Sequence, residues 1–166
     1  MTPTEAAIKM TAFYDGNIAD TEHFIKVWTY AAMIADGEHC TDAQKRLIDL
    51  SAVTHDIACP LCRIKYGNTN GKHQEEESEP LLREFFRGTD VTGDELERIV
   101  YLVTHHHTYS PVDGIDYQIL LEADYLVNAA EKKLTKGNIE NFRQKIMKTP
   151  TGIKLLDNIF AAVLRG

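Results

Sequence analysis

Hydrophobic residues recur at intervals of three and four positions along nearly the whole chain, which is the pattern of helices that bury one face. Strict alternation of apolar and polar residues, which would indicate half-buried strands, is essentially absent. The first helix is predicted to begin at Thr2-Pro3 and to run to about Tyr14. Threonine is a good helix cap, proline fits the first turn, and Glu5 completes a capping box.

The next two helices are predicted from their caps and their apolar faces. Asp20 is predicted to cap a second helix, since aspartate accepts hydrogen bonds from the first free backbone amides. One face of that helix carries His23, Val27, Ala31 and Ile34. Thr41, with Gln44 three residues later, is predicted to cap a third helix that runs towards His55.

The segment from 59 to 73 interrupts the helical pattern. It contains the helix breakers Pro60, Gly67, Asn68, Asn70 and Gly71. A long irregular loop is predicted here, and loops of this length are usually functional or disordered, so we interpret it as a mobile substrate-binding flap. Further helices are expected over residues 75–87, 93–106, 114–132, 138–148 and 151–164. The predicted fold is all-α, a compact single-domain helical bundle over residues 1–166.

Composition narrows the function classes. The 166 residues are 43% hydrophobic and 26% charged, within the ordinary globular range. The formal net charge of −7 argues against bulk nucleic acid binding and against an anionic membrane surface. No apolar run approaches the roughly 20 residues of a membrane span, and the first residues lack the features of a signal peptide. Three cysteines, an odd number, favour a reduced cytoplasmic location. The oligomeric state is left open.

Three predicted helices carry a polar side chain on an apolar face. His23 alone would be read as a core histidine, and His55-Asp56 as favourable charge at a helix end. Asp124 is more informative, because a lone carboxylate among apolar neighbours costs several kcal/mol unless it is paired or metal-bound. The simplest common partner of all four residues is a divalent cation. Imidazole and carboxylate ligands suit Mn, Fe, Co, Ni, Zn or Mg better than copper or an iron–sulfur cluster.

The order of these residues resembles the HD superfamily of metal-dependent phosphohydrolases, in its compact single-domain bacterial type. The resemblance rests on the histidine of Glu22-His23-Phe24, the pair in Thr54-His55-Asp56-Ile57, and the aspartate of Glu122-Ala123-Asp124-Tyr125. It covers residues from about 20 to 130, and leaves the C-terminal helices, over 138–164, without a motif. It implies that His23, His55, Asp56 and Asp124 bind the metal.

Members of this superfamily with two metals have additional histidine ligands, and Asp56 would then bridge the metals. His106 and His107 are the candidates, and His107-Thr108 precedes Asp124 by 17 residues, a spacing similar to that of the dinucleoside polyphosphate hydrolase branch. The two-metal members have a histidine four residues before a glycine in the middle segment. The matching positions here are Gln74 and Ser78, and His73 is one residue away from the histidine position. One metal site is expected, and a second is left open.

The segment after the His-Asp pair has three cations, Arg63, Lys65 and Lys72, and no acid between residues 59 and 73. These side chains either lie on the solvated surface or contact the phosphate of a substrate. Their joint position beside the metal favours phosphate contact. Many relatives have lysine or glutamate where this chain has Cys59. Arg63 and Lys65 are therefore candidate catalytic cations, and Arg63, Lys65, Lys72 and His107 are candidate substrate-binding residues.

We expect a metal-dependent phosphohydrolase acting on a nucleotide or another small phosphate ester, by way of a metal-activated water with Asp56 placed to accept a proton. Whether it cleaves monoesters or diesters is left open. The alternatives are an HD-fold di-iron oxygenase and a metal- or nucleotide-binding domain without turnover. The pair Cys59 and Cys62 has redox or zinc spacing, but one such pair alone is treated as incidental.

Overall fold

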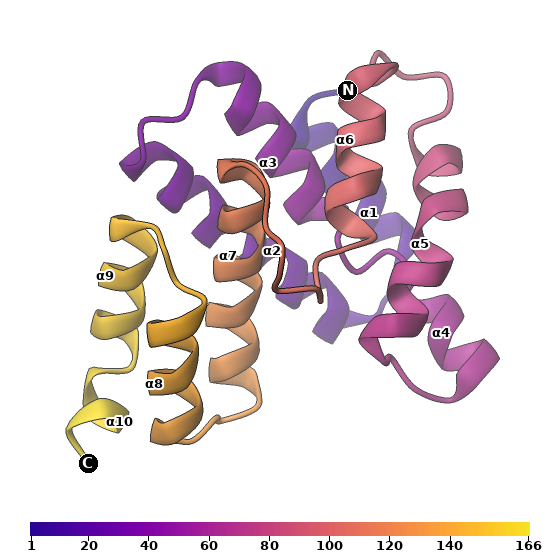
Figure 1. Ribbon diagram of the computed structural model, residues 1–166. Helices are drawn as coiled ribbons and strands as arrows, with labels where there is room; N and C mark the ends of the chain where they lie inside the picture. The colour runs from indigo at the N-terminus through magenta and orange to yellow at the C-terminus, as the bar shows by residue number, and fades with distance from the viewer.

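The computed structural model describes all 166 residues as ten helices without a strand, which confirms the all-α prediction. Figure 1 shows their arrangement in space. In chain order they are α1 (Pro3–Phe13), α2 (Ile18–Gly37), α3 (Asp42–Thr54), α4 (Cys59–Tyr66), α5 (Gly71–Phe85), α6 (Asp94–Val103), α7 (Ile115–Glu131), α8 (Lys136–Lys145), α9 (Pro150–Ile159) and α10 (Ala161–Arg165). None of these helices combines the length and the apolarity that a membrane crossing requires.

Local capping explains where most helices begin. Thr2 and Thr41 form the predicted capping boxes of α1 and α3. The prediction that Asp20 caps α2 was wrong. Asn17 is the cap: its side-chain oxygen accepts a hydrogen bond from the backbone amide of Asp20. The helix therefore starts one turn earlier, and the Asp20 carboxylate is available for other partners.

The predicted loop over 59–73 was also wrong, because its helix breakers mark helix ends. Pro60 lies in the first turn of α4, where a missing amide hydrogen costs nothing. Gly67 ends α4 in the left-handed conformation, with φ of 70°, and Asn70 caps α5. The predicted final helix is divided in two at Phe160, between α9 and α10.

Two groups of buried side chains hold the helices together. One is built mainly on α2 and α7 and extends to α8 and α9, and the other joins α1, α3, α5 and α6. Helix α3 contributes to both, with Ile48 in the first group and Leu50 in the second. In Figure 1 the pair α8–α9 lies beyond α7 on one side, and α4–α5 lies on the opposite side. The C-terminal end of α3 therefore lies deep between the two halves.

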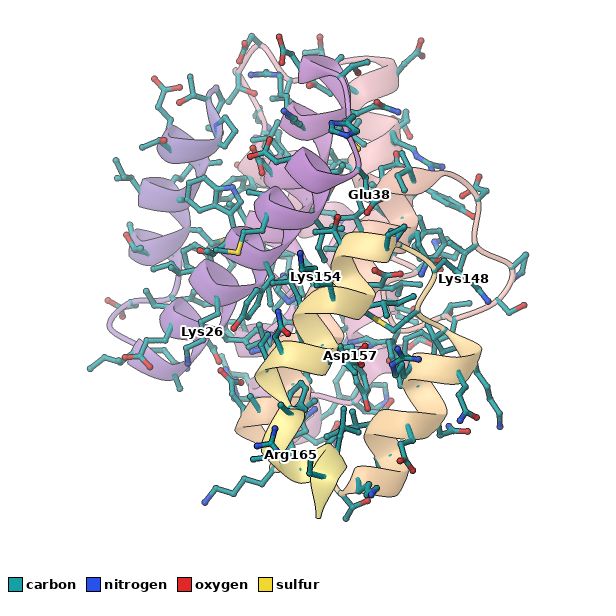
Figure 2. All side chains as sticks on the ribbon, turned by 90° about the vertical axis from the view of Figure 1, so that its left-hand side faces the viewer. Lys26, Glu38, Lys148, Lys154, Asp157 and Arg165 are labelled. Carbon is teal, nitrogen blue, oxygen red and sulfur yellow. The ribbon has the colours of Figure 1, made fainter.

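The C-terminal helices are tied to α7 by a buried carboxylate. Glu122, which is fully buried, accepts hydrogen bonds from the backbone amides of Lys148 at 2.6 Å and Thr149 at 3.0 Å. The Gln118 side chain donates at 2.7 Å, and the Thr149 hydroxyl donates to the second oxygen. Gly152 leaves room for this carboxylate, since a Cβ there would lie 2.0 Å from it. Figure 2 shows α9 beside α8, with Lys154 labelled on α9 and Asp157 on the side towards α8, where it pairs with Arg143.

Candidate functional site

Four side chains from three parts of the chain meet inside the bundle. His23 comes from α2, Asp124 from α7, and His55 and Asp56 from the end of α3. The Nε2 atom of His23 lies 3.3 Å from Asp124 Oδ1, 3.3 Å from His55 Nε2 and 3.5 Å from Asp56 Oδ2. His55 Nε2 lies 3.6 Å from each of the two carboxylate oxygens. The structure thus brings together all four residues singled out from the sequence.

These spacings fit a metal ion. Nitrogen and oxygen ligands bound 2.0–2.2 Å from one ion lie roughly 3.0–3.6 Å from each other. The observed separations, 3.3 to 3.6 Å, are in that range. His55 and Asp124 are almost completely buried, at 0% and 4% exposure, so their polar atoms need a partner other than bulk water. The group can therefore hold a divalent cation.

Hydrogen bonds on the far side of each imidazole orient its Nε2 atom. The Nδ1 atoms of His55 and His106 lie 2.7 Å from the carbonyl oxygens of Ala52 and Val103, which can only accept. In His23, Nδ1 lies 2.9 Å from a carboxylate oxygen of Glu131. Each ring therefore carries its proton on Nδ1 when neutral and directs the Nε2 lone pair into the site, as a metal ligand requires.

A second group of possible ligands adjoins the first. Asp56, His106 and His107 each offer an atom to a common point. His106 Nε2 lies 3.5 Å from Asp56 Oδ1, the oxygen that does not face His23. The Nε2 atoms of His106 and His107 are buried without a hydrogen-bond partner, which is costly unless something binds them. His105, the first residue of the triplet, turns away and bonds the Tyr101 carbonyl.

The middle position remains without a histidine ligand. Gln74 lines the pocket beside the site; its amide nitrogen donates to the Thr69 carbonyl at 2.9 Å, and its Oε1 is buried without a partner. Ser78 lies behind it and donates to the Gln74 carbonyl. His73 stacks on Tyr66, with ring centroids 3.9 Å apart, and does not line the pocket.

The charges in the site shift one another's pKa values. Burial opposes protonation of His23, but the hydrogen bond to Asp124 and the nearby carboxylates outweigh it and raise the pKa of this imidazole to about 9. Burial would raise the pKa of Asp56, yet the charges of His55 and the other imidazoles lower it. Burial, helped by the charge of His106, lowers the pKa of His107 to about 4. His107 is therefore neutral at pH 7.

The family model for the HD domain matches residues 21–134, which is most of the chain. This chain belongs to the HD domain family. Members of the family are generally metal-dependent hydrolases. Among solved structures, the chain is similar to that of a predicted HD superfamily hydrolase from an uncultured Thermotogales bacterium. The TM-score is 0.71 over 98% of this chain and 87% of that chain, at 17% identity, a likeness that shows the fold. No match to this chain was found among curated proteins.

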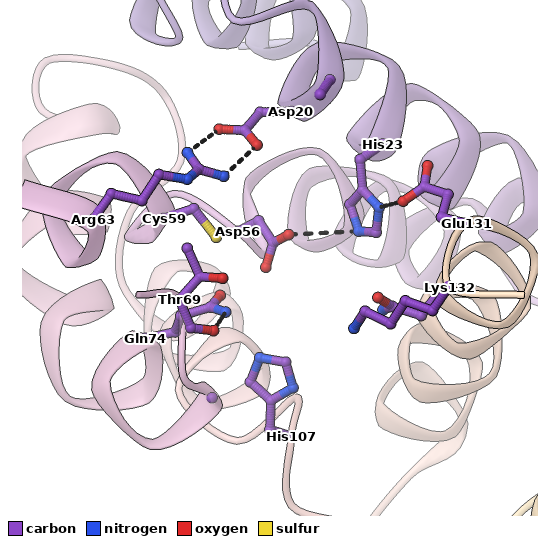
Figure 3. Close-up of a pocket in the computed structure, with 13 residues that line it drawn as sticks. Asp20, His23, Asp56, Cys59, Arg63, Thr69, Gln74, His107, Glu131 and Lys132 are labelled. Atoms are coloured by element: carbon purple, nitrogen blue, oxygen red, sulfur yellow. Dashed lines mark hydrogen bonds and ion pairs between the residues drawn. The ribbon is translucent and has the colours of Figure 1, made fainter. Parts of the chain in front are cut away.

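A pocket of about 430 Å³ opens next to the histidines and aspartates of this HD domain (Figure 3). Arg63 lines it, and its two terminal nitrogens each lie 2.6 Å from an oxygen of Asp20. Cys59 also lines the pocket, and burial raises the pKa of its thiol, so it is not a thiolate nucleophile. The structure does not bring Lys65 or Lys72 into this pocket. Lys65 pairs with Glu77, and Lys72 is 80% exposed.

Sequence reasoning missed several residues of the HD domain's pocket. Asn128 and Glu131 follow Asp124 by four and seven positions, so they lie on the same face of α7. Asn128 donates to Asp124 Oδ1 at 2.6 Å, and Glu131 bonds His23. Helical spacing from Asp124 was the signal that could have identified both. Lys132 and Asp20 also line the pocket, and no local pattern marks either as a pocket residue.

Proposed function

We propose that this HD domain is a metal-dependent phosphohydrolase that acts on a nucleotide or another small phosphate ester through a metal-activated water. The observation that carries the proposal is the convergence of two imidazole nitrogens and two carboxylate oxygens, 3.3 to 3.6 Å apart. Two of these residues, His23 and Asp56, line an open polar pocket. Such a donor set holds a divalent cation while one side faces incoming substrate.

His23, His55, Asp56 and Asp124 would hold the cation. When bound, a divalent cation supplies a Lewis acid for a phosphoryl oxygen and lowers the pKa of a water molecule towards neutrality. The two Asp56 oxygens face different imidazoles, His23 and His106. This carboxylate could therefore serve both ligand groups, and it is placed to accept a proton from water. His106 and His107 would complete a second metal site.

The remaining roles concern the phosphoryl group. Arg63 faces the pocket as a cation whose position Asp20 fixes, so it is the candidate to stabilise negative charge on phosphoryl oxygens. His107 contributes a neutral ring to the same lining.

A di-iron oxygenase would need histidine or carboxylate ligands at six positions, and the amide of Gln74 lies where one of them is expected. We therefore place the oxygenase second.

Asp124 provides the test, with Asp124→Asn as the variant because it removes the charge and keeps the shape. Wild-type protein reconstituted with Mn should release phosphate from phosphate esters and retain metal after gel filtration. Asp124→Asn should lose both metal and activity, whereas the surface variant Asp157→Asn should keep both. Metal content unchanged in Asp124→Asn would contradict the four-residue site. Oxygen uptake by iron-loaded protein without phosphate release would instead support the oxygenase.

A further inference from the structure

The lining of the pocket constrains which phosphate ester can enter. Its only apolar members are Ala19 and Cys59, and it contains no phenylalanine, tyrosine or tryptophan. Proteins that recognise nucleobases hold them between aromatic or apolar side chains. The lining is polar instead, with Thr69, Gln74 and Asn128 among its members.

The two imidazoles of the lining are already engaged by neighbouring groups. Both nitrogens of His23 have partners within 3.5 Å, and its ring packs against that of His55, with centroids 5.3 Å apart. The ring of His107 contacts His106, with centroids 3.9 Å apart, and presses on Gly71, where a Cβ would lie 2.6 Å from the ring. Each imidazole of the lining therefore already has an aromatic neighbour, and a nucleobase would have to share the ring with it.

The cations limit the charge of the substrate. Arg63 and Lys132 are the only lysine or arginine residues in the lining, and both terminal nitrogens of Arg63 are paired with Asp20. Lys132, at the end of α7, forms no ion pair, although Glu131 beside it pairs with Lys26. In Figure 3 the Lys132 side chain extends into the cleft from the side opposite Arg63. Apart from bound metal, the lining thus has one unpaired side-chain cation, which suits a single phosphoryl group better than a chain of phosphates.

We propose that the substrate is the monophosphate ester of a small, polyhydroxylated alcohol, and that Lys132 binds its phosphoryl group. This inference rests on the proposed phosphohydrolase function and narrows it. The ester's hydroxyl groups would bond the polar wall, and neither a base nor a second phosphate would find a partner.

Three related compounds test the substrate class. Ribose 5-phosphate has the proposed features, adenosine 5′-monophosphate adds a base to the same phosphorylated sugar, and adenosine 5′-triphosphate adds two further phosphates. On Mn-loaded protein, kcat/KM for ribose 5-phosphate should equal or exceed both other values. A stacked base improves binding by about tenfold or more, so a gain of that size with either nucleotide would overturn the proposal.

Lys132→Ala tests the contact. Losing a hydrogen bond between charged groups should raise KM for ribose 5-phosphate about 10- to 100-fold, with metal content unchanged. Lys132→Arg should largely restore KM because it keeps the charge. Lys154→Ala, an exposed lysine on the outer side of α9, is the matched control (Figure 2). An unchanged KM in Lys132→Ala would overturn the role of Lys132.

Failure of this inference can be told apart from failure of the hydrolase function. If no ester releases phosphate, including the general substrate p-nitrophenyl phosphate, the phosphohydrolase proposal fails. Binding then tests the proposed substrate class. The rise in melting temperature of metal-loaded protein is measured with each of the three compounds, and the three rises are compared. Stronger binding of either nucleotide, or no binding of ribose 5-phosphate, would overturn it.

Discussion

The buried carboxylate of Glu122 offers a quantitative test of how the C-terminal helices are attached. Glu122→Gln keeps the shape of the side chain and removes its charge. In the wild type, one carboxylate oxygen accepts hydrogen bonds from the amides of Lys148 and Thr149 and from the Gln118 side chain, at 2.6, 3.0 and 2.7 Å. A hydrogen bond to a charged group contributes about 1.5–3 kcal/mol, against about 0.5–1.5 kcal/mol between neutral groups.

Three such bonds would each lose about 1 kcal/mol, so Glu122→Gln should lower the free energy of unfolding by about 2–3 kcal/mol. For a chain of this length that corresponds to a melting temperature lower by about 4–12 °C. Urea denaturation of metal-free protein, followed by circular dichroism, measures the change. Glu84→Gln, at a surface ion pair with Arg87, should cost at most about 1 kcal/mol.

Metal content of folded Glu122→Gln should equal that of the wild type, because Glu122 lies outside the ligand group. A loss below about 0.5 kcal/mol would refute the reasoning, since it would mean that the carboxylate charge does not strengthen these bonds.

Three further predictions concern the site. If the wild type binds two metal ions, His106→Ala combined with His107→Ala should lower the bound metal towards one ion and sharply reduce turnover. If the wild type binds one ion, the double variant should keep that ion and still lose turnover. Full turnover with unchanged metal would contradict any role of these histidines. Arg63→Ala should raise KM or lower kcat on phosphate esters while leaving metal content intact, and unchanged kinetics would make Arg63 a structural partner of Asp20. In metal-free protein the pKa of His23 is raised to about 9 from an ordinary value of 6.5. The charged imidazole therefore stabilises the fold fully below pH 6.5, and this stabilisation is lost as the pH rises through 9. The melting temperature of metal-free wild type, relative to His23→Gln, should therefore fall between pH 6.5 and pH 9.5, and a constant difference would contradict the raised pKa.

Much of the fold follows from local signals in the sequence. The capping boxes at Thr2 and Thr41 begin α1 and α3 as predicted, because a cap bonds amides only two or three residues away. The loop prediction over 59–73 failed for a related reason. Gly67 and Asn70 do break helices, but each occupies a helix end, and composition alone does not separate an end from an interior.

The four candidate metal ligands could be found from the sequence because burial leaves a pattern. Asp124 lies on an apolar helix, and a carboxylate in that setting needs a partner. The sequence thus determined which buried polar side chains need a binding partner. The family resemblance then connected them, because His23, His55-Asp56 and Asp124 occur in the family's order. Their separations of 3.3 to 3.6 Å exist only once α2, α3 and α7 are packed together.

The partners of the cations were decided by the tertiary structure alone. Along the chain, Arg63 and Lys65 stand in a segment without acids, which suggested that both were free for phosphate. Packing brings Asp20 from α2 to Arg63 and Glu77 from α5 to Lys65, while Lys132 at the end of α7 enters the pocket unpaired. Capping and apolar periodicity are short-range and can be read from neighbouring residues. Ion pairing depends on distances between helices far apart in the chain, and only the packed core determines those distances.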